Sequence, residues 1–79
     1  SLQAVASARE NVNQARQQVV SAQTEVDRAQ VEVNAANREL KRSTELLENG
    51  VISRLEYDQA KDRVENANVA LRNQKARLE

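Results

Sequence analysis

The chain has 79 residues, with no cysteine, proline or histidine, one glycine and one aromatic side chain. Its 12 basic and 12 acidic residues cancel. Binding of phosphates requires surplus positive charge and stacking on bases requires aromatic rings, so the composition excludes a typical nucleic-acid-binding domain. Without His or Cys, the common zinc, haem-attachment and thiol sites are also excluded, and we expect no cofactor and no metal.

A heptad repeat runs along the first 48 residues. Large apolar side chains recur every seven positions, and small ones follow three positions later. In heptad notation these are positions a and d, and so long a repeat is typical of a coiled-coil helix. The absence of proline permits one continuous helix, which we predict over about residues 1–48 with a length of ~70 Å at 1.5 Å per residue. The a positions are Val5, Val12, Val19, Val26, Val33, Leu40 and Leu47, and the d positions are Ala8, Ala15, Ala22, Ala29, Ala36 and Ser43.

The dipeptide Asn49-Gly50 predicts the end of this helix. Glycine adopts the left-handed backbone conformation at low cost, and this conformation commonly closes a helix in a Schellman motif. In such a motif Val51 would contact Leu46.

A second helix is predicted from residue 53 to residue 79. Ser53 and Glu56 have the spacing of a capping box, and Ile52 with Tyr57 has that of a hydrophobic staple. A linker of about four residues favours antiparallel neighbours, so we predict an all-α fold, a long antiparallel two-helix coiled-coil hairpin. The a positions of this helix are Tyr57, Val64, Leu71 and Leu78, and its d positions are Ala60, Ala67 and Gln74.

The register of the hairpin follows from placing a opposite d on the other helix. Every layer then opposes a large side chain to a small or polar one, in pairs symmetric about Gly50. On the flanks, Glu39 faces Arg63 and Glu25 faces Arg77, which predicts two ion pairs. The central layers are Leu40 with Ala60, Ala36 with Val64, Val33 with Ala67, and Ala29 with Leu71.

The first 20 residues have no partner in this register, although their heptads continue without interruption. We expect the hairpin domain, residues 1–79, to be a piece of a longer protein whose second arm continues beyond Glu79. In this chain by itself, we predict that the exposed apolar stripe leads to self-association.

No catalytic constellation is present, and we do not expect an enzyme. The carboxylates occupy outward heptad positions with no His or Cys beside them. The turn is different, because Leu46, Val51, Ile52 and Leu55 are apolar and lie outside positions a and d. An apolar tip on a long stalk suggests a docking end. A purely structural coiled-coil spacer, or a homo-oligomerisation rod, is the alternative.

The residues around the turn resemble the hairpin tip of periplasmic adaptor proteins, the membrane fusion proteins of tripartite efflux pumps and type I secretion systems. The resemblance rests on Arg42-x3-Leu46-x6-Ser53 with the following Glu56-Tyr57-Asp58-Gln59-Ala60. It implies that Arg42, Leu46 and Ser53 dock a TolC-type outer-membrane channel, while Asn49, Gly50, Ile52 and Glu56 form the turn and its caps.

The same resemblance implies the setting of the hairpin. In that family six protomers assemble their hairpins into a tube in the periplasm of a double-membrane bacterium. Other domains, absent from this sequence, contact an inner-membrane transporter. The long first arm favours an adaptor of an ATP-driven (ABC-type) exporter.

Overall fold

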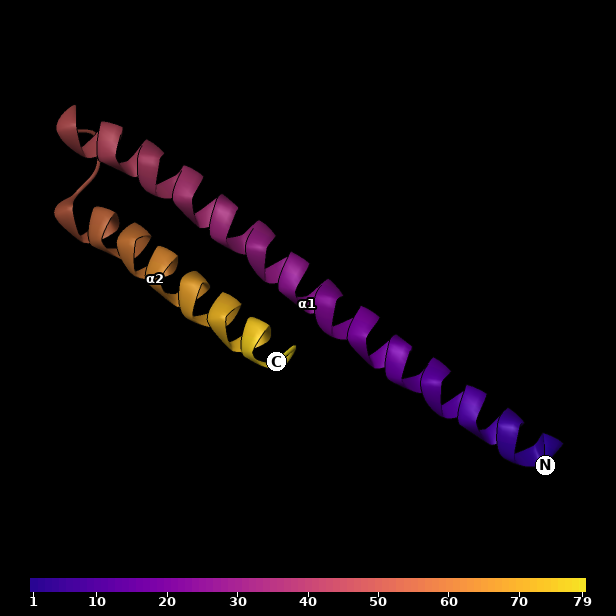
Figure 1. The fold of residues 1–79 in the computed structure, drawn as a ribbon. Helices are drawn as coiled ribbons and strands as arrows, with labels where there is room; N and C mark the ends of the chain where they lie inside the picture. Colours follow the sequence, from indigo (N-terminus) through magenta and orange to yellow (C-terminus); the bar gives the residue numbers. More distant parts are fainter.

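Two antiparallel helices make up the computed structural model, which describes all 79 residues. Helix α1 spans Leu2–Glu48 and helix α2 spans Arg54–Ala76. They lie side by side over the length of α2 and are joined by a short turn (Figure 1). The molecule measures 74 × 14 × 12 Å, which confirms the predicted helical hairpin. Neither helix is both long and apolar enough to cross a membrane.

The seam between the helices follows the heptads. Every a and d residue from Ala22 to Leu47, and from Tyr57 to Gln74, is buried or half-buried. The most enclosed position is Ala36, which is 0% exposed. The absence of a side chain beyond Cβ at this position lets the two backbones approach closely, as the large-to-small pairing requires. The buried residues are Val26, Val33, Ala36, Ser43, Ala60 and Leu71.

The contacts at the centre of the seam agree with the predicted register. Val26, Val33 and Leu71 form one apolar cluster, and Ala29 and Ala67 pack against it. Four of these residues are the members of the adjacent layers Ala29 with Leu71 and Val33 with Ala67, and Val26 belongs to the next layer, opposite Gln74. The repeat therefore predicted which helix faces meet and how the two helices are aligned.

Two details of the hairpin differ from the prediction. Helix α2 ends at Ala76, not at residue 79, and Arg77 is its C-cap. Beyond this point Leu78 lies beside Val19 and Ala22 of α1 but is still 37% exposed, whereas Leu71, one heptad earlier, is 8% exposed. The last residues therefore lack the packing that stabilises the rest of the helix.

The predicted ion pairs between the helices are wrong. Glu39 contacts Arg42 of its own helix, with 2.7 Å between carboxylate Oε2 and guanidinium Nη1. Glu25 contacts Arg28 of its own helix at 3.5 Å. Arg63 crosses to Glu32, one heptad away from Glu39, at 3.9 Å. Exposed ion pairs differ from one another by only tenths of a kcal/mol, about the cost of a rotamer change, so register does not decide among them.

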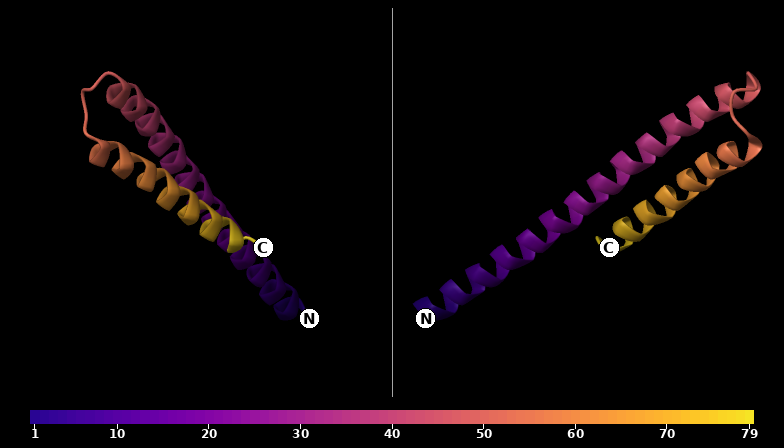
Figure 2. Two further views of the ribbon diagram at one scale, coloured as in Figure 1. Left: turned by 90° about the vertical axis from the view of Figure 1, so that its left-hand side faces the viewer. Right: turned by 180° about the vertical axis from the view of Figure 1, so that it is seen from behind.

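The amino-terminal part of α1 extends beyond the end of α2 (Figure 2). Residues 1–21 are all exposed. Val5 and Val12 are each 50% exposed and Val19 is 61% exposed. The predicted unpaired stripe is thus present, and no segment of this chain covers it.

Candidate partner-binding tip

The turn that ends α1 is a Schellman motif. Gly50 has φ +71°, in the left-handed region. The Gly50 N–H donates to the Leu47 carbonyl at 3.0 Å, and the Val51 N–H donates to the Leu46 carbonyl at 2.8 Å. These two bonds satisfy carbonyls that the helix end would otherwise leave unpaired. Asn49 is the C-cap residue. The left-handed glycine and both hydrogen bonds of a Schellman ending are thus present.

Ser53 starts α2 as its N-cap. Its hydroxyl accepts a hydrogen bond from the Glu56 N–H at 3.1 Å. The backbone of Ser53 is extended, with φ −78° and ψ 161°, as N-cap residues require. Only this half of the predicted capping box forms, since the Glu56 side chain makes no hydrogen bond to the Ser53 backbone. Glu56 instead places its charge in the first turn, where the helix dipole favours an acid.

Arg42 and Leu46 lie one helical turn apart on α1, so their side chains share a face. The Arg42 side chain is 66% exposed and is held by Glu39. Leu46 is half-buried. Together they place a positive charge and an apolar side chain on the approach to the turn, while Ser53 lies on the other side of it.

The tip has more apolar surface than its caps use. Val51 and Leu55 are each 66% exposed, although the Val51 N–H is bound to the Leu46 carbonyl. Capping contacts therefore do not account for these two side chains. Their exposure leaves an apolar patch at the end of the rod, which is the property of a docking surface.

A shallow groove lies along the seam next to the turn. Among its lining residues are Leu46 and Ile52 from the two sides of the turn, and Glu56 from the first turn of α2. Of the predicted tip and cap residues, the structure thus brings Leu46, Ile52 and Glu56 to one groove. Arg42, Asn49 and Ser53 lie outside its lining.

One cluster at the tip escaped the sequence analysis. The guanidinium of Arg54 lies 5.5 Å from the centre of the Tyr57 ring, and the Lys61 ammonium lies 5.6 Å from it. Arg54 also contacts Asp58 at 3.5 Å. The spacing of these residues by three and four positions was the available signal, because such residues are neighbours on a helix. No group of three or more acidic side chains comes together as a metal site.

The comparison with known proteins gives one match. The family described as "RND MFP, alpha-helical hairpin domain", where MFP denotes a membrane fusion protein, matches residues 18–79. The matched region contains all of α2, the turn and the paired part of α1. It gives no support to the ATP-driven exporter that the length of the first arm suggested. Neither a curated protein nor a solved structure matches the chain.

Proposed function

Since this chain belongs to the alpha-helical hairpin family of RND membrane fusion proteins, we propose that it is a docking and assembly module whose tip binds the periplasmic end of a TolC-type outer-membrane channel. Its family is one of periplasmic adaptors, which have no catalytic role. The work of such a module is mechanical: it holds the channel in line with an inner-membrane transporter and seals the path between them.

The exposed apolar tip is the observation that carries this proposal. Val51 and Leu55 are 66% exposed on a turn that its own hydrogen bonds already hold in one conformation. A preorganised apolar end loses little conformational entropy when it binds, so the contact is favourable even though the patch is small. The 74 Å rod then carries this end away from the rest of the protein.

Arg42, Leu46 and Ser53 would form the contact with the channel. Leu46 would fill an apolar site, because it is half-buried at the edge of the groove. Arg42 would exchange its exposed partner Glu39 for a carboxylate or carbonyl of the channel, at little cost because exposed ion pairs are weak. The Ser53 hydroxyl, which accepts one bond from the Glu56 N–H, can still donate its own proton.

The sides of the rod would pack against neighbouring hairpins in a tube of six protomers. The outward faces of both helices are rich in Asn, Gln, Arg and Glu and expose few large apolar side chains. Polar faces of this kind suit side-by-side contacts that are hydrated and reversible. The inner-membrane transporter would be contacted through domains outside this chain, and the assembly would lie in the periplasm.

Binding of the hairpin to an immobilised, detergent-purified channel of the TolC type tests the tip assignment. Two variants add a negative charge without harming the fold: Leu46→Glu keeps a good helix former, and Ser53→Asp keeps an N-cap. We expect each to weaken binding by at least about tenfold, because the new charge would be desolvated at the contact. Val31→Glu is the matched control, since Val31 is 61% exposed on the outer face of α1, far from the tip.

Unchanged binding of both tip variants would refute the docking role. It would favour the second candidate, a coiled-coil spacer or oligomerisation rod, which explains the heptads equally well. The exposed Val51 and Leu55 argue against that candidate, because a spacer needs no apolar end.

A further inference from the structure

Each helix has an outer face on the side opposite the seam. It consists of heptad positions b, c and f, which point away from the seam positions a and d. Where the two helices lie side by side, every side chain at positions b and f is exposed. These side chains include Val31 of α1, which is 61% exposed, and Val69 of α2, which is 39% exposed. The hairpin therefore has one uncovered outer face at each of its two edges.

The two outer faces are complementary when they are compared at equal heights on the rod. Residues at one height are equidistant from Gly50 in the sequence, to within one residue, as they are in the layers of the seam. At positions b and f, each charge that has a charged counterpart is level with one of opposite sign, and valine is level with valine. The level pairs are Val31 with Val69 and Arg38 with Asp62 at position f, and Lys41 with Asp58 and Asp27 with Arg72 at position b.

Like charges lie close together on both outer faces near the tip. Arg38 and Lys41 are three residues apart on α1, so their charges repel each other. Asp58 and Asp62 are four residues apart on α2 and repel in the same way. The only ion pair that any of the four makes within the chain joins Asp58 to Arg54, at 3.5 Å. Opposite charges from outside the chain would relieve both repulsions.

We propose that the outer face of α1 binds the outer face of α2 of a second copy of this chain, with the two tips level and pointing the same way. The proposal rests on the proposed function in one respect, that neighbouring hairpins stand side by side. Within one hairpin the two outer faces lie at opposite edges, so the complementary pairs form only between copies. Each copy uses α1 toward one neighbour and α2 toward the other, and a contact of this kind repeats around a ring.

Charge sets the relative height of the two copies. A shift of the neighbour by one heptad in one direction brings Glu45 level with Asp62. The opposite shift brings Asp27 level with Glu65, and it sets the apolar Val31 against Asp62. Like charges that face each other disfavour both shifted arrangements. The level arrangement therefore places neighbouring tips in one plane, where all of them reach the end of a channel together.

Charge also decides which faces meet. If two copies that point the same way joined α1 to α1, Arg38 would face Arg38 and Lys41 would face Lys41. Contact of α2 with α2 would set Asp62 against Asp62. Only contact of α1 with α2 joins opposite charges at each height. Because exposed ion pairs are weak, we expect association of the free chain only at concentrations of about 1 mM, and a covalent trap is needed to detect it.

Cross-linking of mixed single-cysteine variants tests the geometry, since the chain has no cysteine of its own. Two variants, one of them carrying a tag that changes its size, are mixed at about 1 mM and treated with a short thiol-to-thiol linker. Val31→Cys should cross-link to Val69→Cys, and Thr24→Cys should cross-link to Ala76→Cys. The two exchanged mixtures should give at least about fivefold less mixed dimer, because their cysteines lie one heptad, about 10 Å, apart along the rod.

Three results of this experiment would overturn the proposal. They are equal yields in all four mixtures, no mixed dimer in any of them, and covalent dimers of a single variant as abundant as the mixed dimer. A mixture of cysteines one heptad apart that gave the highest yield would overturn the level arrangement and leave the side-by-side assembly standing.

Charge exchange between the two chains of a mixture tests the ion pairs. Arg38→Asp in the Val31→Cys chain should lower the yield of mixed dimer about fivefold, and so should Asp62→Arg in the Val69→Cys chain. The two substitutions together should restore the yield, because opposite charges again face each other. A doubly exchanged mixture that loses as much as the two single losses combined would show that these side chains do not meet.

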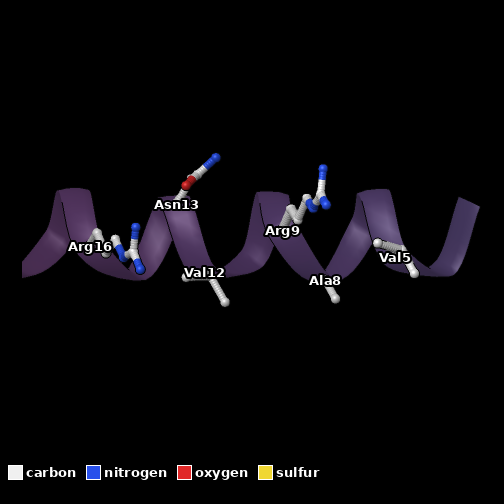
Figure 3. Close-up of a pocket in the computed structure, with 6 residues that line it drawn as sticks. All are labelled: Val5, Ala8, Arg9, Val12, Asn13 and Arg16. Carbon is white, nitrogen blue, oxygen red and sulfur yellow. The ribbon is translucent and has the colours of Figure 1, made fainter. Parts of the chain in front are cut away.

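Arg9→Glu in the Val31→Cys chain is the control for charge exchange. Arg9 lies at position e, outside the outer face, on the part of α1 that extends beyond α2. Its side chain points away from Ala8 and Val12 (Figure 3). This variant should leave the yield of mixed dimer unchanged, and a loss as large as that of Arg38→Asp would mean that net charge, not the pairing, controls association.

Two variants separate this contact from docking at the tip. Leu46→Glu should weaken binding to the channel but leave the pattern of cross-links unchanged, because Leu46 lies at position g, outside the outer face. Val31→Glu should leave the binding of dilute, single hairpins to the channel unchanged but lower the yield of Thr24→Cys with Ala76→Cys. Normal docking with equal yields in all mixtures would overturn the lateral contact alone, whereas lost docking specificity with the expected pattern of cross-links would overturn the docking role alone.

Discussion

Exchanging the side chains of one seam layer is the sharpest test of the hairpin register. Leu71 is 8% exposed and packs in a cluster whose edge includes Ala29, the residue predicted to face it. Leu71→Ala removes three carbons at about 0.8 kcal/mol each. The seam is open at its sides, so little cavity energy is added, and we expect a loss of about 2–3 kcal/mol in the free energy of unfolding.

The reverse substitution probes the same layer from the other helix. Ala29→Leu sets leucine against leucine where the backbones approach closely, which should cost about 1–3 kcal/mol through overpacking. In the double variant a large side chain again faces a small one, but the leucine now lies on α1 and the alanine on α2. We therefore expect the double variant to recover most of the loss, with a coupling free energy of at least about 1.5 kcal/mol.

Urea unfolding followed by circular dichroism at 222 nm measures these differences, at low chain concentration so that self-association is minimised. Ala15→Leu is the matched control, because Ala15 occupies the same heptad position as Ala29 but is exposed and unpaired within the chain. It should change the free energy of unfolding by less than about 0.5 kcal/mol. If the losses of the two single variants simply add in the double variant, Ala29 and Leu71 do not share a layer and the register is refuted.

Two further predictions concern the turn. Gly50→Ala should lower the free energy of unfolding by about 1 kcal/mol, because alanine disfavours the left-handed backbone conformation of this position, φ +71°. The added Cβ itself would meet no atom within 4 Å. Gly50→Asn should cost less, because asparagine tolerates this conformation better. A thermal melt in which Gly50→Ala matched the wild type would contradict this account. Ser53→Ala should lower the free energy of unfolding by about 1 kcal/mol, because the Glu56 N–H loses the side-chain oxygen to which it donates. Ser53→Asp should retain the stability of the wild type, because aspartate is also a good N-cap. Equal urea midpoints for alanine and aspartate at this position would show that the cap is not stabilising.

The seam and the turn were predictable because both depend on local spacing. A period of seven sets the direction of each Cα–Cβ bond on a helix, so the large and small positions identify the buried face before any partner is known. Gly50 and Ser53 act through hydrogen bonds that span only a few residues, and the structure places both as predicted. Leu46 could be singled out as an apolar side chain outside the seam, whereas Arg42 was identified only through the resemblance of the tip motif.

The surface ion pairs, the cluster at Tyr57 and the exposure of the tip depend on the three-dimensional arrangement of the chain and could not be predicted from spacing. The partners of Glu39 and Arg63 depend on which of several exposed groups lies within reach, and the alternatives differ by less than the energy of one rotamer. The cluster of Arg54 and Lys61 around Tyr57 likewise depends on the side-chain conformation that the Tyr57 ring adopts at the seam. The exposure of Val51 and Leu55 required the path of the chain through the turn, because spacing does not show how much of a side chain its caps cover.

By itself, then, the sequence determined two helices, their shared face, their single fold point and their alignment, because a periodic pattern of side-chain volume admits one low-energy pairing. The tertiary structure decided where α2 stops, how polar side chains pair on the surface, and which apolar groups stay in contact with water. The physical reason is the size of the energies involved. Burial of the seam totals many kcal/mol and follows the pattern, whereas fraying, ion pairing and exposure at the tip are settled by differences of about 1 kcal/mol or less.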